Sequence, residues 1–279
     1  MLGIIGGSGI YEALGFENAH EERVQTPFGD PSAPLEVGEL AGTEVAFLPR
    51  HGRDHQYDPT NVPYRANLHA LKQVGVEHVV ATNAVGSLRE DLPPRTLVVP
   101  DQLFDRTRDR PRSYFGDGLV VHVSMADPYC PHLSERLLDC TGATDADVVD
   151  GGTYVCIEGP QFSTTAESEF YRDRGFDVIG MTTVPEAQLA REAELCYTAL
   201  TGVTDYDVWH DEEEVSLETV LGHAAANEDS MSSILDSFLR SFDGYDCECH
   251  DALEDAINTP PEAIDRETRE KVSLLLGDY

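Results

Sequence analysis

The chain has 279 residues, of which 41% are hydrophobic, and its formal net charge at pH 7 is −33. Its cations are 17 arginines and only two lysines, Lys72 and Lys271, and its acids are spread along the whole sequence. This charge argues against nucleic acid or an anionic membrane as a partner, because both repel an acidic surface.

Short apolar runs alternate with amphipathic segments. The apolar runs predict strands at residues 2–5, 44–48, 78–81, 96–99, 153–157, 177–180 and 195–203. The amphipathic segments predict helices at residues 62–74, 132–139, 165–174, 185–193, 216–238 and 261–276, and residues 243–251 are expected to form a surface loop. Capping boxes are expected where Thr164 precedes Glu167 and where Thr183 precedes Glu186. The pattern predicts an α/β fold with a central mixed sheet flanked by helices, as a single domain over residues 1–279 in which residues 241–279 form a helical tail.

No targeting signal is apparent. The first residues lack the basic start of a secretory signal, and no stretch approaches the length of a membrane span. We expect a soluble, cytoplasmic protein whose six cysteines are reduced. No second ligand pair follows the Cys247-x-Cys249 run, so no metal site is expected. Salt screens self-repulsion of such an acidic surface, which suggests a halophilic source.

Two motifs near the N-terminus could bind an anion. Gly6-Gly7-Ser8-Gly9 follows the first strand and offers backbone N–H groups and a hydroxyl, although it could equally be a plain tight turn. Arg50-His51 ends the second strand and combines a guanidinium with an imidazole donor, a pairing suited to a phosphate. The alternative for this pair is a basic surface patch.

Small and polar residues follow three later strands. Asn83 and Ala84 lie in the first such stretch, and Phe162 and Ser163 lie in the second, where an aromatic ring could stack on a base. Met181 and Thr182 precede a helix, so that a soft apolar contact and a phosphate ligand could lie side by side. Core packing and helix capping are the alternatives for these residues.

Two acids follow the apolar run at 195–203. Asp205 and Asp207 are spaced so that both project from one side of an extended segment, although a solvated acidic loop has the same appearance. All these motifs follow predicted strands, and open α/β sheets bind their ligands at the carboxyl ends of strands. We therefore expect an anion site and an acidic site to share one crevice.

Together these motifs resemble those of the purine nucleoside phosphorylases of the trimeric class, and are most similar to the branch that acts on S-methyl-5'-thioadenosine. The resemblance covers about residues 2–240. It implies a nucleoside phosphorylase-like fold and a pentosyltransferase reaction. In that reaction phosphate attacks C1' of a purine nucleoside, which releases the base and a sugar 1-phosphate.

The resemblance also assigns roles to residues. It implies phosphate binding by Ser8, Arg50, His51, Asn83, Ala84 and Thr182. It implies substrate contacts by Phe162, Ser163, Met181, Asp205, Asp207, Leu217, Val220 and, from a neighbouring subunit, His122, with Leu275 near the 5' pocket. No cofactor besides phosphate is implied, and the assembly is expected to be a trimer or a dimer of trimers.

Asp205 is expected to decide the chemistry. A protonated Asp205 could hydrogen-bond purine N7 of the departing base, which requires a raised pKa. Its carboxyl can accept from a 6-amino group but not from a 6-oxo group, which predicts adenine as the base.

Other functions stay open. Asn83 is shared with inosine-type relatives, so a broader purine nucleoside phosphorylase is an alternative, as are a nucleosidase and a non-catalytic nucleoside-binding protein. The Cys247-x-Cys249 pair resembles a feature of archaeal members from hot habitats, which implies a disulfide at this position.

Overall fold

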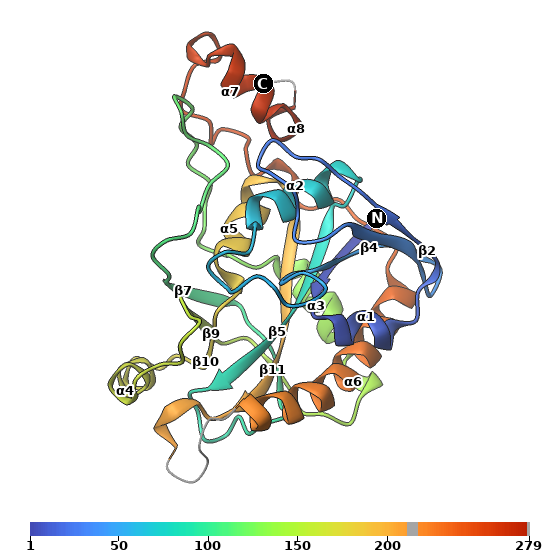
Figure 1. Cartoon of the computed structure of the whole chain (residues 1–279), viewed down its shortest axis with the longest axis vertical. Coiled ribbons are helices and arrows are strands. Elements are labelled where there is room, and N and C mark those ends of the chain that lie inside the picture. Colours follow the sequence, from blue (N-terminus) through green and yellow to red (C-terminus); the bar gives the residue numbers. More distant parts are fainter. Residues whose placement is uncertain (211–216, 278–279) are drawn as a thin grey trace.

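The computed structural model describes residues 1–210 and 217–277, except for the side chains of Ser8, Leu217 and Thr219. Eleven strands in this part of the chain form one mixed sheet with helices on both faces (Figure 1). The strands are β1 (Leu2–Gly6), β2 (Glu17–Glu22), β3 (Leu35–Leu40), β4 (Thr43–Pro49), β5 (His78–Ser87), β6 (Leu97–Val99), β7 (Gln102–Arg106), β8 (Val148–Asp150), β9 (Thr153–Ile157), β10 (Val178–Gly180) and β11 (Cys196–Asp205).

The helices surround this sheet. They are α1 (Ser8–Leu14), α2 (Tyr64–Gln73), α3 (Pro131–Leu138), α4 (Thr165–Asp173), α5 (Thr183–Glu192), α6 (Leu217–Ser241), α7 (Arg266–Lys271) and α8 (Ser273–Leu276), with 3-10 turns η1 (Thr141–Ala143), η2 (Asp207–Trp209), η3 (Glu248–Asp251) and η4 (Pro261–Ala263). Within the described ranges, no helix is both long and apolar enough to cross a membrane.

Strand β5 joins the two parts of the sheet. Its first residues pair in parallel with β1 on one side and with β11 on the other. Where β1 ends, β10 takes its place and pairs antiparallel with Gly86 and Ser87. Because β10 runs antiparallel to β5, its carboxyl end points back toward the middle of β5. Strand β9 pairs in parallel with β10, and β7 pairs in parallel with β9.

Two apolar layers cover the faces of the sheet. Helices α2 and α5 pack on one face in a cluster that also contains Leu275 of α8. Helices α1, α3 and α6 pack on the other face, around Ile10, Leu133 and Phe238. Because both faces are covered, the central strands β1, β5 and β11 consist mainly of buried residues, as the continuous apolar runs predict.

The predicted α/β fold with a mixed sheet is confirmed, but several elements differ from the predictions. Strands β2, β3, β7 and β8 and helix α1 were missed; β2 is an exposed, wholly polar edge strand that lacks an apolar signal. Strand β5 extends to Ser87, so Asn83 and Ala84 lie within the strand rather than after it. The predicted helix at 261–276 is wrong, because η4, α7 and α8 occupy this range as separate short helices.

Two local predictions also need correction. The capping box at Thr164 and Glu167 is present, but the one at Thr183 is wrong, because Glu186 instead bonds to Arg50 and Tyr197. Residues 243–251 are not simply a surface loop, since Cys249 in this range is only 4% exposed.

Candidate active site

Three chain segments meet where β1, β4 and β5 approach one another. The backbone N–H of Arg50 donates to the carbonyl of Gly6 at 3.0 Å. A Cβ on Gly6 would lie 2.5 Å from Thr82 Oγ1, so only glycine allows β1 and β5 to approach this closely. The Gly6 turn and Arg50 are therefore neighbours, as the sequence analysis expects. Ser8 begins α1 directly after this turn, and its side chain lies outside the described part of the chain.

Arg50 is buried in an ion pair. Its Nε and Nη2 donate to the two carboxylate oxygens of Glu186 at 2.5 and 3.0 Å, and Nη1 donates to the carbonyl of Thr82 at 2.9 Å. Burial lowers the pKa of Arg50, but the Glu186 carboxylate more than offsets this and raises it. Hydrogen bonds to described residues thus use three of the five guanidinium N–H groups, which leaves two that could meet an anion.

His51 follows Arg50 but is not the imidazole donor that the sequence analysis expects. Its Nδ1 lies 2.8 Å from the carbonyl oxygen of Tyr57, and a carbonyl can only accept, so Nδ1 carries the proton. Burial and the neighbouring Arg50 charge lower the pKa of His51 to about 4. The ring is therefore neutral at pH 7, and Nε2 is a hydrogen-bond acceptor.

Asn83 joins β5 to the segment that enters α5. Its Nδ2 donates to Thr182 Oγ1 at 2.6 Å, and both residues are buried. Its Oδ1 is buried without a hydrogen-bond partner among the described residues. Ala84 is the exposed residue of β5. Thr182 does not sit on a regular helical turn, because Val184 and Pro185 have non-helical backbone angles.

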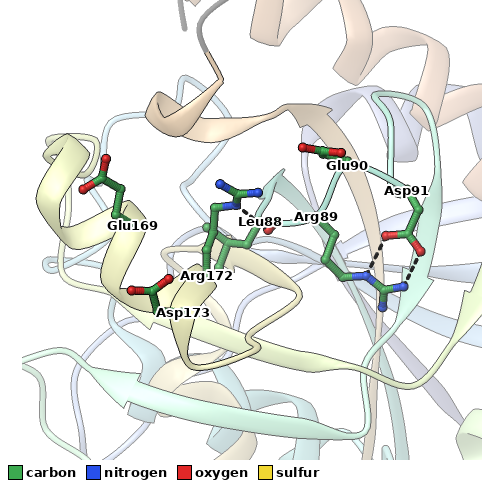
Figure 2. A pocket seen from close by; sticks show the side chains of 7 residues that line it. All are labelled: Leu88, Arg89, Glu90, Asp91, Glu169, Arg172 and Asp173. Atoms are coloured by element: carbon green, nitrogen blue, oxygen red, sulfur yellow. Dashed lines mark hydrogen bonds and ion pairs between the residues drawn. The ribbon is translucent and has the colours of Figure 1, made fainter.

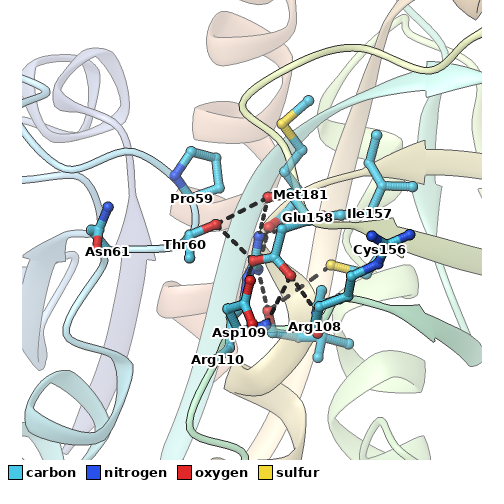
Figure 3. Close-up of polar contacts among 12 residues, drawn as sticks. Pro59, Thr60, Asn61, Arg108, Asp109, Arg110, Cys156, Ile157, Glu158 and Met181 are labelled. Carbon is cyan, nitrogen blue, oxygen red and sulfur yellow. Dashed lines mark hydrogen bonds and ion pairs between the residues drawn. The ribbon is translucent and has the colours of Figure 1, made fainter.

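An arginine that the sequence analysis missed organises the adjoining loops. Arg110 is 4% exposed, and its Nη1 donates to the carbonyls of Met181 and Val184 at 2.6 and 2.5 Å. Its Nη2 donates to the carbonyl of Glu158 at 2.6 Å, and its Nε donates to the Glu158 carboxylate at 3.0 Å (Figure 3). Arg110 therefore ties the loop after β9 to the segment between β10 and α5.

Glu158 is held by several donors in this network. Thr60 Oγ1 donates to its carboxylate at 2.6 Å, and the backbone N–H groups of Arg108 and Asp109 also donate to it (Figure 3). Burial raises the pKa of Glu158, but these bonds and that from Arg110 outweigh it and lower the pKa to about 2. The carboxylate is ionised at neutral pH and fixes the loop in place.

Asp205 is the last residue of β11, and Asp207 follows it at the start of η2. Asp205 is 7% exposed; its Oδ2 accepts from Thr204 Oγ1 at 2.7 Å and its Oδ1 accepts from the Asp207 backbone N–H at 2.8 Å. A β-bulge between Val203 and Asp205 places Asp205 opposite Gly86 of β5. Burial, followed by the nearby Asp205 charge, raises the pKa of Asp207. The solvated-loop alternative is therefore wrong, because both acids are buried.

Two of the residues expected to bind phosphate, Asn83 and Ala84, and the first of the two acids lie on neighbouring strands, β5 and β11. Asn83 precedes Gly86 by three residues, which corresponds to about 10 Å of extended strand. Asp205 lies beside Gly86, so Asn83 and Asp205 are about three strand positions apart along the β5–β11 pair. That these two groups of residues form one site stays a prediction.

The structure connects the other residues expected to contact the substrate less directly to Asn83 and Asp205. Met181 lies beside Gly159, where a Cβ would be 2.5 Å from the Met181 sulfur. Phe162 is 49% exposed, and Ser163 is half-buried with a buried hydroxyl that lacks a partner within the described ranges. Val220 is half-buried on α6, and the Leu217 side chain lies outside the described part of the chain.

His122 and Leu275 lie with the C-terminal segment. The His122 backbone N–H donates to the carbonyl of Ala256 at 2.9 Å, and Leu275 is buried in the apolar layer beside α2 and α5. Neither contacts Asp205 or Asn83 in the hydrogen bonds of the described residues.

A surface hollow of about 510 Å³ lies beside the end of β5 but contains none of the expected site residues (Figure 2). It is lined by Leu88, Arg89, Glu90, Asp91, Glu169, Arg172 and Asp173. Its two arginines are already bonded, Arg89 to Asp91 and Arg172 to the Leu88 carbonyl (Figure 2). We therefore place the candidate site at Asn83 and Asp205 rather than in this hollow.

Comparison with known proteins identifies the family of this chain. Residues 1–240 match the model of the phosphorylase superfamily. The chain therefore belongs to the phosphorylase superfamily.

Individual relatives identify the family within this superfamily to which the chain belongs. The S-methyl-5'-thioadenosine phosphorylase of Chloroflexus aurantiacus is 48% identical, with 100% of this chain and 98% of that protein covered. The S-methyl-5'-thioadenosine phosphorylase of Koribacter versatilis is 46% identical, with coverage of 100% and 96%. A methylthioadenosine phosphorylase from an antarctic soil metagenomic library has a TM-score of 0.93 at 44% identity, covering 98% of both chains. Within the superfamily, the chain is a member of the S-methyl-5'-thioadenosine phosphorylase family.

Proposed function

We propose that this chain cleaves S-methyl-5'-thioadenosine with phosphate, giving adenine and 5-methylthioribose 1-phosphate. The observation that carries the proposal is the pair of buried groups on neighbouring strands: Arg50 and Asn83 at one point and Asp205 about three strand positions further on. The named relatives support this substrate, and the Schistosoma mansoni methylthioadenosine phosphorylase in complex with adenine has a TM-score of 0.81 and 37% identity, covering 85% of this chain and 90% of that one.

The phosphate would bind at the junction of β1, β4 and β5. In the proposal the phosphate ligands are Ser8, Arg50, His51, Asn83, Ala84 and Thr182. The two remaining Arg50 N–H groups and the backbone N–H groups near Gly6 and Ala84 are donors to anionic oxygens. His51 Nε2 and Asn83 Oδ1 are acceptors, so they suit a protonated phosphate oxygen or a sugar hydroxyl.

The purine would bind at the end of β11. As the C1'–N9 bond breaks, its electron pair moves onto the purine while a phosphate oxygen bonds to C1'. In the proposal Asp205 presents a proton to N7 of the leaving base, and Asp207, whose pKa burial raises, lies beside it because its backbone N–H donates to Asp205 Oδ1. Asp205 would also accept a hydrogen bond from the 6-amino group, while Phe162 and Ser163 would line the base region.

The ribosyl and 5' groups would lie between these two ends. Met181 would contact the ribosyl group, since Arg110 fixes the Met181 backbone beside Glu158. Leu217 and Val220 on α6 and Leu275 on α8 would line the 5' pocket. His122 would reach the site of a neighbouring subunit, so the proposed assembly is a homotrimer or a dimer of such trimers.

The proposed reaction needs only phosphate as co-substrate. The acidic composition further suggests a halophilic protein. We also propose that it works in the cytoplasm. A broader purine nucleoside phosphorylase is the second candidate, because Asn83 is shared with inosine-type relatives. A Schistosoma mansoni relative with 35% identity is named an adenosine/methylthioadenosine phosphorylase, which supports adenosine as a further substrate.

Incubation with three nucleosides tests the proposal. Methylthioadenosine, adenosine and inosine are each supplied with and without phosphate, and free base is measured by chromatography. We expect adenine from methylthioadenosine only when phosphate is present. Base release without phosphate would indicate a nucleosidase, and tight binding without any release would indicate a binding protein.

A further inference from the structure

Four of the six cysteines converge in space although they are scattered in the sequence. The sulfur atoms of Cys130, Cys196, Cys247 and Cys249 all lie within 4.8 Å of one another, and the Cys130 and Cys247 sulfurs are 3.6 Å apart. All six cysteines of the chain are free thiols, so the Cys247–Cys249 disulfide that the resemblance implies is not present. We propose that these four sulfurs form a structural site for one thiophilic divalent cation, with zinc as the preferred ion.

The spacing of the sulfurs suits a tetrahedral ion. Zinc–thiolate bonds are about 2.3 Å long, which places tetrahedral sulfur ligands roughly 3.8 Å apart. Each sulfur here has three candidate neighbours within 4.8 Å, which is the arrangement of a four-ligand site rather than of one isolated pair. A small contraction of the cluster would bring all four sulfurs onto one ion. Four-thiolate sites select zinc or iron over magnesium or calcium.

The surroundings favour thiolates. Cys130 is the N-cap of α3, and its sulfur accepts from the Leu133 backbone N–H at 3.4 Å, so the positive end of the helix faces it. The Arg191 guanidinium donates to the Cys249 sulfur at 3.5 Å. Four thiolates and one divalent ion carry a net charge of −2, and these two positive groups partly neutralise it.

The site is closed, as structural sites are. Cys130, Cys196 and Cys249 are at most 4% exposed, and Cys247 is half-buried. His250 Nε2 lies 3.6 Å from the Cys196 sulfur, in the position of an outer group that orients a ligand. His78, Cys196 and His250 are also close together, but they share Cys196 with the cysteine cluster, so we assign one ion rather than two.

The cluster lies far from the candidate active site and joins separate elements. Cys196 begins β11 whereas Asp205 ends it, which puts the two roughly 30 Å apart along the strand. Cys247 and Cys249 belong to the segment that follows α6 and leads past the sheet to α7 and α8 (Figure 1). An ion here would fasten that segment to α3 and β11 and would take no part in the chemistry of the site.

The ligand spacing explains why the sequence alone does not indicate this site. Cys247 and Cys249 are a single close pair, and the other two ligands come from far upstream in the chain. The fold brings them together because the Cys130 backbone N–H donates to the Tyr197 carbonyl at 2.7 Å, which places the start of α3 beside the start of β11.

Metal content of purified protein tests the proposal. The full chain is produced in a reducing bacterial cytosol, purified at high salt without a metal-affinity tag or chelator, and measured by native mass spectrometry and elemental analysis. We expect one equivalent of zinc or iron per chain and four thiols protected from alkylation until the metal is removed. Cys130→Ser and Cys249→Ser should each reduce bound metal by at least tenfold, and Cys140→Ser, a buried cysteine outside the cluster, should leave it unchanged.

A second measurement covers variants that fail to fold. Unmutated protein stripped of metal is titrated with Co²⁺, and a four-thiolate site should give intense thiolate-to-metal charge-transfer absorption at one equivalent. Metal removal should lower the melting temperature and speed proteolysis after residue 241, with little change in kcat for the remaining folded protein. Protein that is metal-free with disulfides among these four cysteines, or that is fully reduced and gives no Co²⁺ absorption, would overturn the proposal.

Discussion

Arg50 and Glu186 form a two-bond ion pair in the interior of the protein, with Nη2 and Oε2 3.0 Å apart and both side chains at most 4% exposed. Tyr197 also donates to Glu186, at 2.9 Å, so the carboxylate is fixed from two sides. The guanidinium therefore has little freedom, and its two remaining N–H groups have fixed directions. We infer that Glu186 is a positioning residue for phosphate, acting through Arg50.

Replacement of Glu186 by Gln tests this inference. The variant leaves the Arg50 charge buried without its counter-ion, so we expect a loss of about 3 kcal/mol in the free energy of unfolding. The phosphate KM should rise by tenfold or more, with a smaller change in the nucleoside KM. Arg50→Ala should raise the phosphate KM still more steeply. Glu39→Gln, an exposed change on β3, is the control, and an unchanged phosphate KM in both site variants would contradict the assignment.

Arg110→Lys should disturb the site although the charge is kept. A lysine ammonium has three donors and cannot reproduce the planar set of bonds that Arg110 makes to Glu158, Met181 and Val184. Buried carbonyls lose their partners, and we expect the free energy of unfolding to fall by about 2–4 kcal/mol. Denaturant unfolding measures this, with exposed Arg266→Lys as the control. Equal stability of the two variants would show that the Arg110 hydrogen bonds contribute little to the free energy of unfolding.

Asp205→Asn should change base preference. An amide can donate to a 6-oxo group and no longer supplies a carboxylic proton, so turnover of methylthioadenosine should fall by about 100-fold or more. The ratio of kcat/KM for inosine to that for adenosine should rise. Asp139→Asn at the exposed end of α3 is the matched control. An equal loss on both substrates would argue against the base-reading role.

The raised pKa of Asp207 predicts that the free energy of unfolding depends on pH. Its folded pKa lies above 3.8, the ordinary value, because of burial and the Asp205 charge, so the folded state binds more protons than the unfolded state between these two pKa values. Stability contributed by the protonated form is therefore present at low pH and is lost as pH rises through the folded pKa. Melting temperatures at fixed high salt, from pH 4 to 8, should show a smaller decline for Asp207→Asn than for the unmutated protein. Parallel curves would refute this assignment.

Salt removal should destabilise the whole fold. The net charge of −33 arises from acids spread along the whole sequence, and their repulsion grows as screening is withdrawn. Circular dichroism during dialysis should show loss of structure in dilute buffer and recovery when potassium chloride is restored. A neutral osmolyte at equal osmolality is the control, because it does not screen charge. Retention of full structure in dilute buffer would rule out the halophilic interpretation.

The sequence predicts the central strands well. Strands β1, β4, β9 and β11 are apolar runs, and Arg50 and Asp205 follow or end two of them. Asn83 and Thr182 were expected separately, and the structure joins them by a hydrogen bond. Arg50, Thr182 and Asp205 were expected at the ends of strands, where ligand sites gather regardless of the details of packing, whereas Asn83 lies within β5.

The supporting residues could not be found in this way. Glu186 resembles a helix-capping residue in the sequence, yet its partner Arg50 is 136 positions away. Arg110 lies in a polar loop without periodicity, and its burial depends on carbonyls from two other segments. Such long-range pairings leave no local pattern, whereas an unpaired buried charge would be strongly unfavourable in the fold.

The burial of Arg50 and Arg110 has a consequence for how phosphate reaches the protein. Each of these cations is paired with a carboxylate, Glu186 or Glu158, so its attraction for an anion is short-ranged. An approaching phosphate dianion first meets the field of a strongly acidic protein. Diffusional encounter is then slowed by repulsion until the anion is within a Debye length, about 8–10 Å, of its ligands. Dissolved salt would thus raise the association rate of phosphate as well as preserve the fold.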